Sequence, residues 1–154
     1  MGALSVGETI PSFKLKDSNG EEVTLDDLLG DPFVLYFYPK DNTPGCTKEA
    51  CDFRDVIDAF ESMNLLVVGV SPDSVASHQK FSSEHSLTFP LLSDPGFELA
   101  KACGAVKPTE GGKLSIVRST FLCDGDATIH WVESPVQVEG HIGRVIEAAE
   151  TALA

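Results

Sequence analysis

The stretch that decides the fold runs from residue 33 to residue 60 and reads FVLYFYPKDNTPGCTKEACDFRDVIDAF. Its first six residues are apolar or aromatic and a proline ends the run, which is typical of a buried β-strand. Residues 53, 56, 57 and 60 are apolar at the spacing of one helix face. The stretch therefore predicts a strand, a Pro/Gly-rich turn and a helix over about 46–62, with Cys46 where the helix begins.

Cys46 stands at a place that favours an activated thiol. Only the thiolate is a good nucleophile, and the first turn of a helix favours it through unpaired N–H groups and the positive end of the dipole. Thr43 adds a hydroxyl three residues earlier, and Pro44-Gly45 allows the tight turn. Pro39 ends the strand and is placed to shield one side of the thiol from water. The competing interpretation is an ordinary half-buried thiol.

The rest of the chain supplies the other parts of an α/β fold. Runs at 13–16 and 22–25 flank an Asn-Gly pair, which predicts an N-terminal β-hairpin. A second buried strand at 65–70 completes a βαβ unit with parallel strands, because a helix separates it from the first. Further along we expect a helical turn at 26–30, a helix at about 74–86, an extended segment at 89–92, a small helix at about 95–104, a flexible loop at 107–113, strands at 114–123 and 128–132, and a closing helix at about 140–153.

The turn from Pro39 to Cys46 resembles the corresponding segment of a known protein family. Pro39-x-x-x-Thr43-x-x-Cys46 is similar to the active-site signature of the peroxiredoxins, and the longer run to Asp55 resembles their bacterioferritin-comigratory-protein (PrxQ) branch. Further family-like positions are 71–74, 89–94, 118–121 and 140–141, so the resemblance covers nearly the whole chain. It implies a thioredoxin-like fold, in which a central mixed β-sheet is flanked by helices, as a single domain over residues 1–154.

The resemblance also implies an activity, that of a thiol peroxidase acting on hydrogen peroxide and organic hydroperoxides. Cys46 attacks a peroxide oxygen and becomes a sulfenic acid, while Thr43 and Arg118, with the Cys46 N–H, hold the peroxide oxygens in line. Cys51 then condenses with the sulfenic acid, and thioredoxin or a similar dithiol restores both thiols. No cofactor is implied.

Arg118 is the residue expected to stabilise the Cys46 thiolate. It lies within the apolar segment 114–123, where an arginine usually points to solvent. If this segment packs beside residues 33–38, the guanidinium reaches the thiol pocket and stabilises negative charge there. The resemblance implies that catalytic role. Glu49 is either a helix-start acid or a holder of Arg118, and we favour a supporting role, whereas Arg54 is expected to pair with a nearby acid.

The spacing of Cys46 and Cys51 makes a geometric prediction. Residues five apart on an α-helix have Cα atoms about 8.6 Å apart, whereas a disulfide needs roughly 4.4–6.8 Å. The first turn or more must therefore unwind when the two cysteines bond. The alternative for Cys51 is a small apolar residue facing the core, and its position beside the apolar helix face does not decide between them.

The remaining cysteines and the histidines receive structural interpretations. Cys103 and Cys123 are expected to be packing thiols, with Cys123 where the family usually has an aliphatic residue. We expect no metal site, because no two cysteines have the spacing of zinc ligands and no histidine has that spacing from any cysteine. The histidines are scattered and are interpreted as surface or capping residues, at positions 78, 85, 130 and 141.

Charge and hydropathy limit the partners and the location. The formal net charge is −13 with only 11 Lys and Arg spread along the chain, which argues against a nucleic-acid binder. No apolar run approaches the roughly 18 residues of a membrane span, and the N-terminus lacks a signal-peptide core. We expect a cytoplasmic protein, or an organellar one after removal of a transit peptide, that is a monomer or a weak homodimer.

Two other functions compete with the peroxidase. A thioredoxin-type thiol–disulfide oxidoreductase normally uses Cys-x-x-Cys, but residues 46–49 read CTKE. A redox sensor or chaperone whose disulfide changes its surface is the non-enzymatic alternative. Peroxide turnover measured beside disulfide reduction separates the two enzymatic functions, and rapid turnover with a thioredoxin system would make the sensor role secondary.

Overall fold

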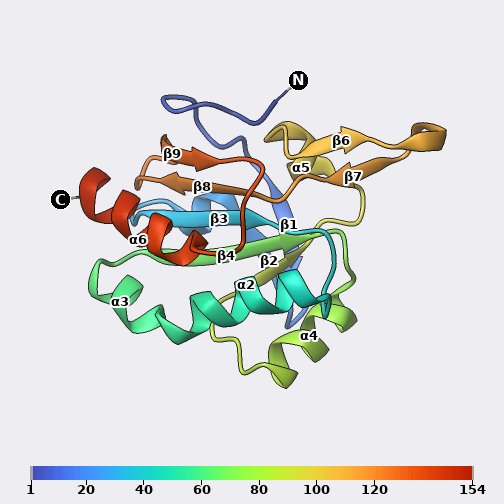
Figure 1. The fold of residues 1–154 in the computed structure, drawn as a ribbon, viewed down its shortest axis with the longest axis horizontal. Coiled ribbons are helices and arrows are strands. Elements are labelled where there is room, and N and C mark those ends of the chain that lie inside the picture. The colour runs from blue at the N-terminus through green and yellow to red at the C-terminus, as the bar shows by residue number, and fades with distance from the viewer. Residues whose placement is uncertain (1, 154) are drawn as a thin grey trace.

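The computed structural model describes residues 2–153. Its middle layer is a seven-stranded sheet in the order β2-β1-β5-β4-β3-β8-β9 (Figure 1). Its strands are β1 (Lys14–Asp17), β2 (Glu22–Thr24), β3 (Phe33–Phe37), β4 (Leu66–Ser71), β5 (Leu91–Ser93), β8 (Ser119–Cys123) and β9 (Ile129–Glu133). The helices are α1 (Leu25–Leu28), α2 (Pro44–Asp55), α3 (Ile57–Ser62), α4 (Val75–Glu84), α5 (Glu98–Ala102) and α6 (His141–Ala152).

The sheet is mixed, as predicted. β3 pairs in parallel with β4, and β4 with β5, because helices connect them. β8 runs antiparallel to both β3 and β9, and β1 runs antiparallel to both β2 and β5. The parallel βαβ unit, the antiparallel strands β8 and β9 and the closing helix α6 confirm the thioredoxin-like fold, and the β1–β2 hairpin is also confirmed.

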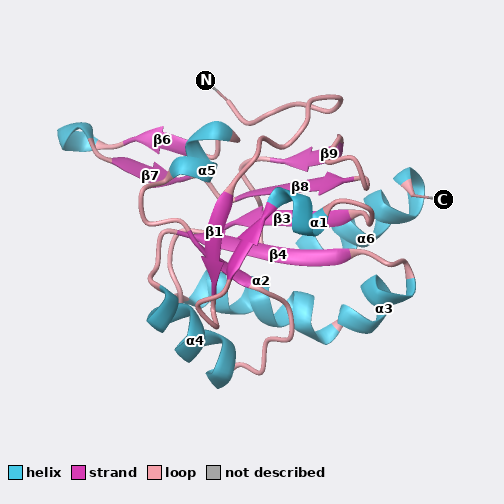
Figure 2. Ribbon diagram, turned by 180° about the vertical axis from the view of Figure 1, so that it is seen from behind, coloured by secondary structure: helices cyan, strands magenta, loops and turns pink. Residues whose placement is uncertain are grey.

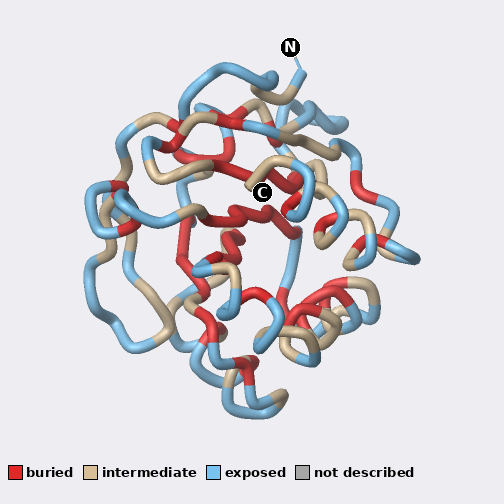
Figure 3. The backbone as a smooth tube through the Cα atoms, turned by 90° about the vertical axis from the view of Figure 1, so that its left-hand side faces the viewer, coloured by how far each residue is buried: buried red, intermediate tan, exposed pale blue. Residues whose placement is uncertain are grey.

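β3 lies at the centre, and its alternating side chains supply two cores. Phe33, Leu35 and Phe37 pack into a cluster with residues of α1 and α5. Val34 and Tyr36 point to the opposite face and pack with residues of α2, α3, α4 and α6. Because helices cover both faces (Figure 2), the strand can be apolar throughout, and Figure 3 shows the buried residues through the middle of the molecule.

The helix predicted over 46–62 is two helices. Val56, with φ −116° and ψ 15°, ends α2 and begins α3. The break falls at two successive β-branched residues, Val56 and Ile57, which are weak helix formers. Phe53 and Phe60 are still buried on the same side, with ring centroids 5.8 Å apart.

The predictions for 107–123 need correction. The expected flexible loop belongs to a small hairpin that projects from the main sheet, formed by β6 (Val106–Pro108), a 3-10 turn (Glu110–Gly112) and β7 (Leu114–Ile116) (Figure 1). The single strand expected over 114–123 is two strands, β7 and β8, separated at Val117 and Arg118. There Val117 N–H donates to the Ala105 carbonyl, while the Arg118 carbonyl accepts from Val136 N–H. These bonds turn the chain from one sheet to the other, so Arg118 stands at a break rather than within a strand.

The other elements lie close to their predicted positions. α4 begins after Ser74, whose hydroxyl accepts from Ser77 N–H and so caps the helix. Within the described residues, no helix has the length and apolar character that a bilayer crossing requires.

Candidate active site

The first turn of α2 holds the predicted nucleophile at the carboxyl end of β3. Thr43 is the N-cap, Pro44 is the first helical residue and Cys46 follows two residues later. Proline suits this position because its missing N–H has no helical partner there. In the part of the chain that the structure describes, Thr43 makes no side-chain capping bond, and its hydroxyl donates to the Lys40 carbonyl at 2.9 Å. Cys46 is the third residue of this helix, so it belongs to the first turn, whose amides have no acceptor within the helix.

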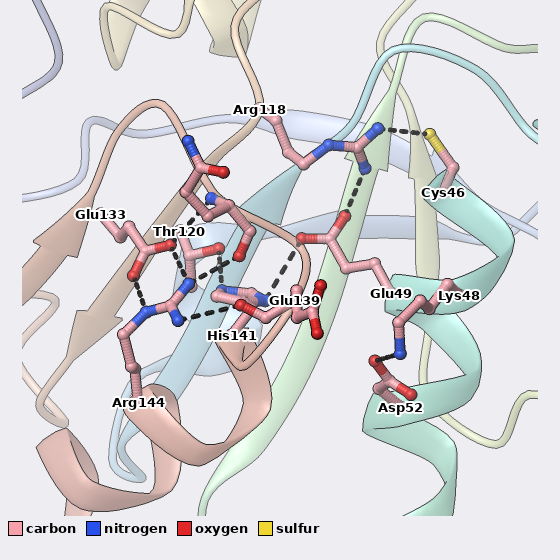
Figure 4. Close-up of polar contacts among 11 residues, drawn as sticks. Cys46, Lys48, Glu49, Asp52, Arg118, Thr120, Glu133, Glu139, His141 and Arg144 are labelled. Atoms are coloured by element: carbon pink, nitrogen blue, oxygen red, sulfur yellow. Dashed lines mark hydrogen bonds and ion pairs between the residues drawn. The ribbon is translucent and has the colours of Figure 1, made fainter. Parts of the chain in front are cut away.

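Arg118 contacts Cys46, although it comes from the break between β7 and β8. Its Nη2 lies 3.3 Å from Cys46 Sγ (Figure 4). The pairing of β3 with β8, which begins at Phe37 and Ser119, brings residue 118 beside the turn that follows β3. Gly45 makes room for the guanidinium, since a Cβ there would lie 3.2 Å from Nη2. The sequence expectation that Arg118 reaches the thiol is confirmed in geometry.

Glu49, one helical turn after Cys46, holds the other side of the guanidinium. Its Oε1 accepts from Arg118 Nη1 at 2.7 Å, and its side chain is fully buried. Burial raises the pKa of Glu49 to about 7, although Arg118 acts to lower it. Burial also disfavours the charge on Arg118, but the contacts with Glu49 and Cys46 outweigh it and raise the pKa of Arg118.

His141 lies behind Glu49, and the prediction of a surface or capping role for it is wrong. The side chain is buried, with Nε2 3.0 Å from Thr120 Oγ1 and Nδ1 3.5 Å from Glu49 Oε2. Burial is the main cause that lowers the pKa of His141 to about 4, so the ring is neutral near pH 7. The sequence did contain a signal for this burial, because His141 is the first residue of an amphipathic helix. α6 packs on α2, where Glu49 lies.

His78 is also buried, which the sequence analysis missed. Its Nδ1 lies 2.7 Å from Asp41 Oδ2, and its Nε2 lies 3.0 Å from the Leu92 carbonyl. Asp41 also accepts from Tyr38 Oη at 2.6 Å. Burial acts to raise the pKa of Asp41, but the bonds from His78 and Tyr38 outweigh it and lower that pKa. Since Asp41 belongs to the turn and His78 to α4, this cluster fixes the turn against the neighbouring helix.

The Asp41 cluster also has the composition of a small metal site. Asp41, Asp73 and His78 offer three ligand atoms within 4.8 Å of one another. Asp73 Oδ2, however, accepts from Asp41 N–H and Ser71 Oγ, both at 2.7 Å. The protein's own hydrogen bonds therefore use these atoms, and we interpret the cluster as a structural one. His85 caps α4 and His130 is exposed, as predicted.

Cys51 lies on the same helix as Cys46 and is partly buried, and both are free thiols in an unbroken α2. Arg54 pairs with Asp55 at 2.9 Å, which confirms its expected ion pair. Pro39 is exposed at the end of β3. Pro39, Thr43, Cys46, Glu49 and Cys51 thus lie along one segment, and Arg118 reaches it from the break between β7 and β8. The catalytic roles of these residues stay predictions.

Cys103 and Cys123 are buried in the core on the opposite face of the sheet. Burial raises the pKa of Cys103 to about 12, and it also raises the pKa of Cys123 well above its usual range. Both stay protonated at neutral pH, which agrees with the packing role expected for them.

The comparisons with known proteins agree with this arrangement. The chain belongs to the AhpC/TSA family, whose model matches residues 6–132, and is thus a peroxiredoxin, a thiol peroxidase. Within it the chain belongs to the bacterioferritin-comigratory-protein (PrxQ) branch. It is 44% identical to a putative peroxiredoxin Bcp of Coxiella burnetii over 94% of this chain and 97% of the relative. It is 42% identical to the peroxiredoxin Bcp of Bacillus subtilis, over 94% of both chains.

Solved structures show the same likeness. A crystal structure of a PrxQ mutant from Xylella fastidiosa superposes with a TM-score of 0.93 at 35% identity, over 100% of both chains. A Xanthomonas campestris bacterioferritin comigratory protein, described in connection with alkyl peroxide reduction, gives 0.90 at 35% identity, again over 100% of both chains.

Proposed function

We propose that Cys46 is the residue that reacts with peroxide, and that the substrates are hydrogen peroxide and organic hydroperoxides. The observation that carries this proposal is the 3.3 Å contact between Arg118 Nη2 and Cys46 Sγ at the start of α2. A fixed guanidinium and free helix amides both favour a thiolate and stabilise negative charge that develops beside it.

The reaction begins with a two-electron attack by sulfur. The Cys46 thiolate bonds to the terminal, hydrogen-bearing oxygen of the hydroperoxide, the O–O bond breaks, and the other oxygen takes up a proton and departs as water or an alcohol. Cys46 is oxidised to sulfenic acid, and the peroxide is reduced. In this proposal Arg118, the first-turn amides and the Thr43 hydroxyl hold the peroxide oxygens, and Pro39 shields the thiol from water.

Cys51 is the proposed resolving residue. Its thiol displaces hydroxide from the Cys46 sulfenic acid, which releases water and forms a Cys46–Cys51 disulfide. Because both residues lie in α2, where helical geometry separates their Cα atoms by about 8.6 Å, the first turn must unwind before the bond can form. Thioredoxin or a similar dithiol then reduces the disulfide.

Composition supports a proposal about the location and assembly of the protein. We place the protein in the cytoplasm, as one domain over residues 1–154 that acts as a monomer or weak homodimer. The high negative charge supports solubility and argues against nucleic acid as a partner.

Peroxide turnover with a thioredoxin system tests the proposal. The Cys46→Ser variant is expected to lose all activity, and Cys51→Ser to form one sulfenic acid per chain without recycling. Cys103→Ala is the matched control, since this thiol is buried in the other core and should leave turnover unchanged. Turnover by Cys46→Ser at the wild-type rate would contradict the proposal, and so would normal recycling by Cys51→Ser.

A further inference from the structure

Two buried polar atoms lie directly behind the catalytic arginine, and the proposed reaction does not use them. Glu49 Oε2 and His141 Nδ1 face each other at 3.5 Å, on side chains that are 0% and 1% exposed (Figure 4). Among residues 2–153, neither atom has a hydrogen-bond partner. Such atoms are costly in a dry interior unless a proton joins them.

The other polar atoms of both side chains are already engaged. Glu49 Oε1 accepts from Arg118 Nη1 at 2.7 Å, and His141 Nε2 lies 3.0 Å from Thr120 Oγ1. A proton that binds to Glu49 therefore goes to Oε2, where it meets the imidazole of His141.

Two arrangements satisfy every one of these atoms. In the first, Glu49 is ionised, His141 carries its proton on Nδ1, and Nε2 accepts from the Thr120 hydroxyl. In the second, Glu49 is protonated on Oε2 and donates to a bare Nδ1, while Nε2–H donates to Thr120 Oγ1. A threonine hydroxyl can donate or accept, so it fits both. The first becomes the second by uptake of one proton from water, with no change in oxidation state.

We propose that His141 is a positioning residue of the peroxidase site, whose neutral ring changes tautomer as Glu49 gains or loses a proton, and which thereby sets how much of the Arg118 charge acts on Cys46. The inference rests on the proposed function of Cys46. It adds a residue and a proton-binding step that the reaction scheme above does not contain.

The electrostatics agree with this geometry. Burial raises the pKa of Glu49 to about 7 and lowers that of His141 to about 4, so proton exchange near neutral pH falls on the carboxyl group. The ionisable groups around the pair come from every neighbouring element: Tyr36 of β3, Cys46 and Asp52 of α2, Arg118, Glu133 of β9 and Arg144 of α6. Arg144 and Glu133 bond to each other at 2.7 Å, which offsets the charge of both.

The consequence concerns the charge beside the thiol. With Glu49 ionised, its charge offsets that of Arg118. With Glu49 protonated, the guanidinium charge acts on Cys46 without that offset. Both states keep Arg118 in place, because Oε1 accepts its hydrogen bond in each.

Nitrogen-15 NMR of the imidazole rings tests the tautomer change in the wild-type protein. Bare and protonated ring nitrogens have different shifts. Between pH 5 and pH 9, Nδ1 of His141 is expected to change from bare to protonated and Nε2 from protonated to bare, with a midpoint near 7. A fixed tautomer, or an imidazolium that forms with the pKa of a free histidine, would overturn the proposal.

A kinetic experiment tests the effect on the thiol. The rate of sulfenic acid formation with hydrogen peroxide is measured from pH 5 to pH 9 in a Cys51→Ser background. An inflection is expected near pH 7. In His141→Phe the pH of this inflection is expected to rise by one unit or more, because ionised Glu49 loses its hydrogen-bond donor at Oε2. In His141→Asn the inflection is expected to return toward pH 7, because the amide can donate that hydrogen bond. His130→Gln is the matched control, since His130 pairs with Asp124 at 2.8 Å on the surface.

The outcomes separate the two proposals. If Cys46 does not react with hydrogen peroxide in the wild type, the proposed function fails. If Cys46 reacts normally but the His141→Phe and His130→Gln profiles coincide, only the role of His141 is wrong.

Discussion

Burial of Glu49 predicts that the stability of the protein falls as the pH rises, which is the opposite of the usual effect of a carboxylate in an ion pair. Burial raises the pKa of Glu49 from 4.5 to about 7. Between these values the folded protein binds a proton that the unfolded chain has released, so the free energy of unfolding falls as the pH rises. The difference of about 2.5 pH units, at about 1.36 kcal/mol each, corresponds to about 3 kcal/mol.

The perturbation is Glu49→Gln, which keeps an oxygen acceptor for Arg118 and removes the ionisable group. Relative to the wild type, the free energy of unfolding of the variant is expected to rise by about 3 kcal/mol between pH 4 and pH 8. The assay is urea unfolding under reducing conditions, followed by the fluorescence of Trp131, the only tryptophan. If the free energy of unfolding falls with urea concentration at the same slope in both proteins, the same unfolding transition is being compared.

The control is Glu133→Gln. The hydrogen bond from Arg144 lowers the pKa of Glu133. The pH dependence therefore has the opposite sign: the free energy of unfolding of the wild type rises relative to that of Glu133→Gln as the pH rises through the acid range. If Glu49→Gln behaves like Glu133→Gln, Glu49 is an ordinary ionised partner of Arg118, and the argument from burial is wrong.

Three further substitutions test the packing around the site. Tyr36→Phe is expected to stabilise the protein by about 1 kcal/mol in urea unfolding, because the buried Tyr36 hydroxyl has no partner among the described residues; a loss of stability would contradict this. Gly69→Ala is expected to destabilise by about 1–3 kcal/mol, since its Cβ would lie 2.9 Å from Leu91 Cδ2; a melting temperature equal to the wild type would show that the strand yields. Gly45→Ala would place a Cβ 3.2 Å from Arg118 Nη2 and push the guanidinium away from the thiol. Slower sulfenic acid formation in a protein of equal or higher stability is expected, because alanine favours the helix; an unchanged rate would mean that the contact is not needed.

Local patterns in the sequence were sufficient for the elements that build the site. The apolar run 33–38 predicts a buried strand, and the apolar residues at 53, 56, 57 and 60 predict a helix that starts near Cys46. These predictions hold because periodicity and turn chemistry act between near neighbours.

The tertiary structure decided which distant side chains meet. Arg118 reaches Cys46 because the chain breaks between two sheets, and that break depends on backbone bonds to residues 105 and 136. Histidines 78 and 141 are buried against Asp41 and Glu49 only because α4 and α6 pack where they do. The spacing of residues along a helix or strand fixes which face they share, but the register and packing of separate elements fix what that face touches, and no local pattern contains that information.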